Sequence, residues 1–158
     1  MCYKPYFMSN FMSNLIEKTV VINAMATDVW KALTQPFLMK QWMGEEEMNL
    51  HIQTSWAVNT PITISGFHHL PFVNKGTILE FDEEKVLSYS HNSSLSHLPD
   101  APENYSVIKF NLSTANAQTA LTLTISNFPT ETIYKHLEFY WQSTIVLLKK
   151  FIENSKLV

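Results

Sequence analysis

The chain of 158 residues contains no arginine, one cysteine and three glycines. All 11 cationic residues are lysines, and 14 acidic residues outnumber them, so the formal net charge is -3. Nucleic-acid-binding faces usually cluster cations and use arginine for bidentate contacts to phosphates or base edges. The only adjacent cationic pair here is Lys149–Lys150. We therefore expect no nucleic-acid partner.

The single cysteine, Cys2, excludes a disulfide within the chain. No stretch approaches the ~20 apolar residues that cross a bilayer, and the N-terminal residues hold no apolar run of signal-peptide length. We expect a cytoplasmic protein without a membrane span. The tetrapeptide FMSN occurs at residues 7–10 and 11–14, so translation could start at Met8 or Met12. Residues 1–14 are predicted to be a flexible extension and residues 15–158 one domain.

The sequence also lacks recognisable catalytic and metal-binding motifs. No Walker loop, Rossmann fingerprint or nucleophile elbow appears around the three glycines. His68 and His69 are adjacent, so on an extended chain they point in opposite directions and make poor ligands for one ion. Further ligands at metal-like spacing are missing, and the run Glu45–Glu47 is typical of solvated charges. We predict no metal, no cofactor and no catalytic group.

Hydrophobic patterns predict the order of the elements. Residues 16–23 are rich in β-branched residues and predict a strand. Residues 28–44 predict two short helices, with Pro36 in the first turn of the second and a left-handed residue at Gly44. Alternation with period two then predicts strands with one buried face. These strands lie within residues 48–54, 61–65, 75–84, 85–92, 105–113 and 118–128, with Thr77, Leu79 and Phe81 sharing one face.

The last part of the chain predicts one long helix. Thr130 is a suitable cap, and Glu131 lies in the first turn, where an acidic residue is favoured. An apolar stripe recurs every three or four residues and consists of Ile133, Leu137, Trp141, Ile145, Leu148 and Ile152. About 24 helical residues span roughly 36 Å, which is long enough to cross a small domain.

These segments resemble the helix-grip family, also called START-related or pollen-allergen-like. Within it they are most similar to the bacterial branch related to the C-terminal domain of the activator of the heat-shock chaperone ATPase. The resemblance rests on TVVINAMATDVWKALTQPFLMKQW, GTILEFDEEKVLSYS and FYWQSTIVLLKKF, and it covers residues 16–155. It implies an α+β fold in which a curved antiparallel sheet of about seven strands wraps around the C-terminal helix. Two short helices follow the first strand in this fold.

Two departures from the family pattern bear on the hollow that such a sheet encloses. The family's paired glycines are absent from HIQTSWAVNTPI, which carries Trp56 instead. The family's Gly-Trp in the last helix is Tyr140–Trp141 in this chain. Both changes place large side chains at positions where members of the family often have small ones. The resemblance therefore implies a hollow that is narrower than usual or shaped for a different ligand.

The leading hypothesis is binding or carriage of a small, mostly apolar molecule without catalysis. The strand register of Tyr89 and His91 places hydrogen-bonding groups among apolar ones, as ligand pockets do. The predicted lining consists of Trp42, Trp56, Phe67, Phe81, Tyr89, His91, Phe110, Leu137, Trp141 and Ile145. In the alternative interpretation, the aromatic residues of this set fill the core instead of lining a cavity. Ligand entry is expected between the last helix and residues 92–104.

Two alternatives remain open. The first is a protein-interaction module with a chaperone as partner, which the family resemblance suggests and which predicts an exposed charged patch and no usable cavity. The second is a cyclase or hydrolase that uses His91 or Tyr89 as acid or base. The fold alone cannot separate the three, because one fold hosts many functions.

Overall fold

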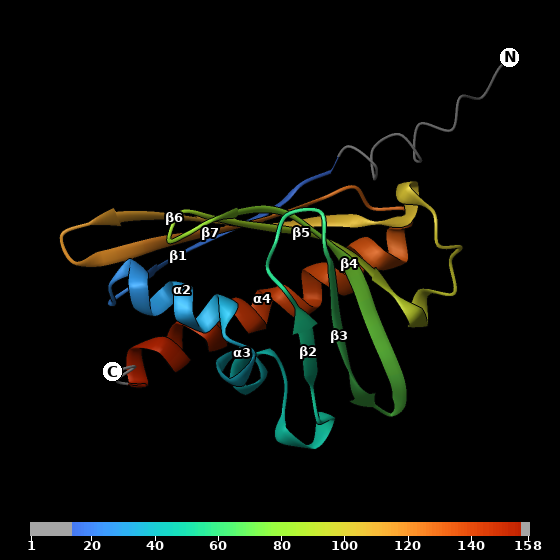
Figure 1. The fold of residues 1–158 in the computed structure, drawn as a ribbon, viewed down its shortest axis with the longest axis horizontal. Helices are drawn as coiled ribbons and strands as arrows, with labels where there is room; N and C mark the ends of the chain where they lie inside the picture. Colours follow the sequence, from blue (N-terminus) through green and yellow to red (C-terminus); the bar gives the residue numbers. More distant parts are fainter. Residues whose placement is uncertain (1–13, 156–158) are drawn as a thin grey trace, which may run out of the picture.

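The computed structural model describes residues 14–155, so the predicted extension lies outside the described residues except for Asn14. The described chain forms a seven-stranded sheet and three α-helices, which confirms the predicted α+β architecture (Figure 1). The helices are α2 (Ala26–Thr34), α3 (Pro36–Met43) and α4 (Glu131–Asn154). The strands are β1 (Ile16–Ile22), β2 (His51–Thr54), β3 (Pro61–His68), β4 (Leu70–Asp82), β5 (Val86–Ser93), β6 (Ser106–Ala115) and β7 (Gln118–Ser126).

The strand order is β1-β7-β6-β5-β4-β3-β2, and every neighbouring pair is antiparallel. The chain leaves β1 at one edge, passes through α2 and α3, and enters β2 at the opposite edge. It then meanders back until β7 pairs with β1. Figure 1 shows the bent sheet with all three helices on one side of it. One face of the sheet is therefore covered by helices.

The core lies between that face and α4, and the predicted stripe on α4 is confirmed. Leu137, Trp141, Ile145, Leu148 and Ile152 are each at most 5% exposed. The helix also begins as predicted, because the Thr130 side chain accepts a hydrogen bond from the backbone N–H of Ile133. These two features fix both the start of α4 and the side that it presents to the sheet.

Aromatic rings join α4 to the sheet and to α3. The Trp141 ring centroid lies 5.7 Å from that of Phe110 in β6 and 6.2 Å from that of Trp42 in α3. The Trp42 indole N–H donates to the Ala32 carbonyl of α2 at 2.9 Å, and the Tyr140 hydroxyl donates to the Met43 carbonyl at 2.6 Å. The junction of Trp42, Phe110 and Trp141 thus connects elements from the whole chain.

The backbone at Gly44 differs from the prediction. Gly44 follows α3, but its conformation is extended (φ -169°), so the expectation of a left-handed residue is wrong. The chain leaves the helix directly into an extended segment, and glycine instead makes room for a neighbour, since a Cβ would lie 2.6 Å from the Met48 sulfur. The left-handed conformations in residues 14–155 all fall on non-glycine residues, among them Trp56 with φ 64°.

The alternation predicted for β4 is also interrupted. The pairing of β4 with β5 shifts register between Ile78 and Glu80, and such a bulge reverses the faces of the residues that follow. Ile78 is fully buried, whereas Leu79 is 38% exposed. Thr77, Leu79 and Phe81 therefore do not share one buried face. Near the bulge the strands approach so closely that a Cβ on Gly76 would lie 1.7 Å from the Ser90 carbonyl oxygen, and only glycine fits there.

Replacing Trp141 by alanine is expected to lower the free energy of unfolding by about 3–5 kcal/mol, because it removes a fully buried ring. Denaturation by urea measures this change. The matched control is Phe139→Ala on the same helix, where the side chain is 79% exposed. The control is expected to change stability by less than about 0.5 kcal/mol. Equal losses in the two variants would contradict a core position for Trp141.

Candidate functional site

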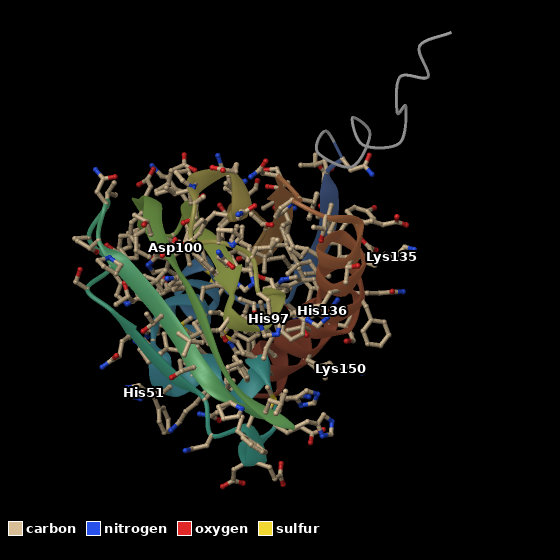
Figure 2. All side chains as sticks on the ribbon, turned by 90° about the vertical axis from the view of Figure 1, so that its right-hand side faces the viewer. His51, His97, Asp100, Lys135, His136 and Lys150 are labelled. Carbon is tan, nitrogen blue, oxygen red and sulfur yellow. The ribbon has the colours of Figure 1, made fainter. Side chains whose placement is uncertain are left out.

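A cavity of about 180 Å³ lies where the first turns of α4 meet the end of β5 and the start of β6. The segment after β5, with the short turns η2 (Ser94–Ser96) and η3 (Pro102–Asn104), borders it as well. The cavity is thus located between α4 and residues 92–104, where we expect ligand entry. Figure 2 faces this end of the molecule, with His136 on α4 and His97 in the loop after β5.

Polar side chains from both strands and from α4 line this cavity. His91 and Asn92 belong to β5, Ser106 is the first residue of β6, and His136 lies on α4. His91 and Ser106 are direct partners in the β5–β6 ladder. Side chains of directly opposite residues lie on the same face of a sheet. The register therefore brings the imidazole and the hydroxyl to the same cavity.

The Ser106 hydroxyl and the His91 ring form no hydrogen bond with other groups of residues 14–155. Ser106 is nevertheless only 1% exposed. Among the described residues, no side-chain polar atom that is sealed from solvent lacks a partner. The free hydroxyl must consequently open onto the cavity. The Asn92 side-chain oxygen, by contrast, accepts a hydrogen bond from the Ser96 hydroxyl at 3.3 Å.

Apolar side chains complete the walls. Ile133 and Leu137 lie four residues apart on α4, so they occupy the same side of the helix. Leu95 of η2 lies at the rim, where it is 43% exposed. None of the lining residues carries a carboxylate. The cavity therefore combines an apolar wall with hydrogen-bonding groups and contains no acidic side chain.

Burial lowers the pKa of His91 from its ordinary 6.5 to about 4, and the nearby His136 adds to this effect. Burial is the larger cause, because a desolvated imidazolium loses its hydration. His91 is therefore neutral near pH 7. Burial likewise raises the pKa of Tyr140 to about 12 and that of Tyr89 above its ordinary value. Both phenols therefore keep their protons near neutral pH.

The structure divides the predicted lining residues among separate places. His91 and Leu137 border the cavity. Trp141 packs against Trp42 and Phe110 in the core, and Tyr89 and Ile145 are buried in the same core, each 3% exposed. For the residues in the core, a part in ligand binding stays a prediction.

The other predicted residues lie farther out. Phe81 lies between Trp56 and Trp30 of α2. Its ring centroid is 5.7 Å from that of Trp56 and 5.2 Å from that of Trp30. Phe67 is 53% exposed and borders a groove of about 390 Å³ beside the β3–β4 hairpin. The predicted set is therefore not brought together around one space.

Sequence reasoning missed Asn92, Ser106 and His136. Ser106 could be found only from the β5–β6 register, which pairs it with His91. A weak signal existed for His136, because Thr132 and His136, like Ile133 and Leu137, are four residues apart and share one side of the last helix. All four of these α4 residues border the cavity.

None of the helices within residues 14–155 combines the length and apolar character that a membrane crossing requires. In that same part of the chain, the His, Cys, Asp and Glu side chains form no group of three able to hold a metal ion. The adjacent His68 and His69 rings lie 4.6 Å apart at the β3–β4 turn.

Comparisons with known proteins place the chain in a broader context. The family described as Activator of Hsp90 ATPase homolog 1-like protein matches residues 23–153. No curated protein matches. A protein from Cytophaga hutchinsonii, solved in solution, is 35% identical over 90% of this chain and 96% of that chain, with a TM-score of 0.74.

More distant structures share the fold. The Aha1 dimer from Colwellia psychrerythraea is 22% identical over 90% of this chain and 98% of that chain, with a TM-score of 0.70. A protein from Mesorhizobium loti is 21% identical over 91% of this chain and 100% of that chain, with a TM-score of 0.72. At these identities the likeness shows the fold alone.

The stability of the protein is expected to depend on His91 between about pH 4 and 6.5. In the unfolded chain His91 binds a proton near pH 6.5, whereas in the fold it stays neutral until about pH 4. Over this window the unfolded state holds more protons, so the free energy of unfolding falls as the pH falls. The loss attributable to His91 is at most about 3 kcal/mol.

Urea denaturation at several pH values measures this dependence. The variant His91→Gln, which cannot be protonated, is expected to show a shallower slope than the unchanged protein. His97→Gln is the matched control, because His97 is exposed in the loop after β5. Parallel profiles for the unchanged protein and His91→Gln would contradict a desolvated, neutral His91.

Proposed function

This chain belongs to the family of Activator of Hsp90 ATPase homolog 1-like proteins, and we propose that it binds a small, partly apolar molecule in the cavity between β5 and α4. The cavity itself is the observation that carries this proposal. Its volume of about 180 Å³ exceeds that of an engineered apolar cavity of ~150 Å³ that binds benzene. A ligand with one ring and a small polar substituent suits this space.

The composition of the walls supports binding. Ile133 and Leu137 offer apolar contact, while Ser106 and His91 offer hydrogen bonds that no other described residue uses. Ligand pockets typically combine a predominantly apolar lining with a few polar groups that orient the ligand. The cavity therefore has both elements that small-molecule recognition requires.

Binding without catalysis fits the geometry better than a hydrolase. Nucleophilic catalysis needs a hydroxyl within hydrogen-bonding reach of its base. Ser106 and His91 are partners in the β5–β6 ladder, yet their side chains form no hydrogen bond. No carboxylate lines the cavity to orient either histidine. Tyr89, the other residue considered for acid–base chemistry, lies in the closed core and retains its proton.

Filling the cavity is expected to abolish the response to small aromatic compounds. Ile133→Phe enlarges a wall residue, and Val146→Phe makes the same kind of change at a position on α4 that is 42% exposed. Thermal denaturation with a panel of one-ring compounds measures binding. A ligand at ~100 times its dissociation constant stabilises the folded state by about 2.7 kcal/mol.

We expect Val146→Phe to keep this stabilisation and Ile133→Phe to lose it, with affinity at least about tenfold weaker, equivalent to ~1.4 kcal/mol. A ligand that stabilises both variants equally would place its site elsewhere. A panel in which no compound stabilises the unchanged protein would argue against the proposed ligand site altogether.

A protein-interaction module is the second candidate. The family description supports it, and so do the exposed apolar residues on the outer side of α4: Phe139 is 79%, Leu147 51% and Val146 42% exposed. A purified chaperone of the Hsp90 family is then expected to bind the unchanged protein and Ile133→Phe alike. Phe139→Ser is expected to weaken that binding. Titration calorimetry measures both, and a chaperone that binds none of these proteins would rule this candidate out.

A further inference from the structure

We propose that the cavity selects a small carboxylate over its neutral analogue, and that His91 takes up a proton from solvent when this ligand binds. The inference rests on the ligand site proposed above and specifies its chemistry. It follows from three features of the cavity: its free hydrogen-bond donors, the helix end that borders it and the absence of acidic lining residues.

The first feature is the set of donors. The Ser106 hydroxyl is 1% exposed, opens onto the cavity and has no partner in residues 14–155. His91 can donate from a ring N–H, and the Asn92 amide belongs to the same lining. A carboxylate accepts hydrogen bonds on two oxygens and donates none. It therefore matches a cavity that is lined by hydroxyl, imidazole and amide groups.

The second feature is the start of α4. Thr132 and Ile133, in the first turn of this helix, border the cavity. The N-terminal end of a helix carries a partial positive charge and favours anions. The N–H of Ile133 already donates a hydrogen bond to the Thr130 hydroxyl. This end of the helix therefore acts on a ligand chiefly through the electric field of the helix dipole. The field and the buried Ser106 hydroxyl both favour a negative group.

The third feature is the balance of charge around His91. In β5, His91 lies between β4 and β6, opposite Ser106, and His136 faces it from α4. On β4, Lys75 pairs with Asp100 at 2.5 Å, and on α4, Lys135 pairs with Glu131 at 2.8 Å. The charges of these four residues are therefore already neutralised within the two ion pairs. A carboxylate in the cavity would be the first opposite charge available to His91.

Proton uptake follows from this arrangement. Without a ligand, His91 is neutral because burial and His136 disfavour its charged form, lowering its pKa to about 4. An adjacent carboxylate reverses the electrostatic preference and stabilises the imidazolium. At neutral pH the complex then holds one proton more than the separate partners. By linkage, affinity falls as the pH rises above the pKa that His91 has in the complex.

The volume of the cavity determines the choice of test ligand. About 180 Å³, bounded by Ile133 and Leu137, accommodates one ring and its carboxylate. Benzoate is therefore the test ligand, and benzamide is its neutral analogue of nearly the same shape. Titration calorimetry with the full chain, at about pH 6, 7 and 8 and in buffers of different ionisation enthalpy, gives both affinity and proton uptake.

We expect benzoate to bind at least about tenfold more tightly than benzamide near pH 6, and to lose up to about tenfold per pH unit above it. Up to one proton should be taken up per benzoate. His91→Gln should abolish the proton uptake and the pH dependence of benzoate binding. His97→Gln, an exposed histidine outside the cavity, should behave as the unchanged protein. Ser106→Ala should weaken benzoate binding severalfold without changing proton uptake.

The two proposals fail in different ways. Benzamide binding as tight as benzoate binding would overturn the selection of a carboxylate, and benzoate binding without proton uptake would overturn the charging of His91. Either result would leave the ligand site intact. If neither compound bound, and no neutral one-ring compound stabilised the protein, both proposals would be overturned. Unchanged proton uptake in folded His91→Gln would also overturn the role of His91, with folding of the variant checked by circular dichroism.

Discussion

The packing of Trp141 against Phe110 and Trp42 is the contact on which the rest of the structure depends. It joins the last helix to a central strand of the sheet and to the connection between the two sheet edges. Buried aromatic side chains contribute more apolar area than any others. Because the same contact holds α4 along the sheet, it also holds the first turns of that helix against β5 and β6. The position of the cavity therefore follows from the core.

The dense packing of aromatic side chains in the core explains where the cavity lies. Interiors pack about as densely as organic crystals, so large rings that contact one another leave little room between them. In this chain Tyr140 and Trp141 stand where the resemblance implies Gly-Trp, and the Tyr140 hydroxyl reaches the Met43 carbonyl. Free volume is found instead beyond the end of the aromatic junction, beside His91 and His136. The bulk implied by the resemblance thus fits a site displaced toward the start of α4.

His91 connects stability with the proposed ligand chemistry. Its burial disfavours the charged form, and this makes the empty fold sensitive to acid. The same burial means that a charge placed beside the ring acts through little intervening water. An imidazole held neutral in this way responds strongly to an anion, whereas a fully solvated histidine would respond weakly. The loss of stability at low pH and the proposed selectivity for an anion therefore have one physical origin.

The sequence by itself determined the elements and their order. Periods of two and of three to four residues act locally, and they predicted the strands, the stripe on α4 and the Thr130 cap, all of which the structure confirms. Local patterns could not reveal the bulge in β4 or the extended backbone at Gly44, because both depend on neighbouring segments. Nor could they pair Ser106 with His91, since strand register is a contact between distant residues. Only the tertiary structure, through register and the docking of α4, decided which polar groups share a cavity.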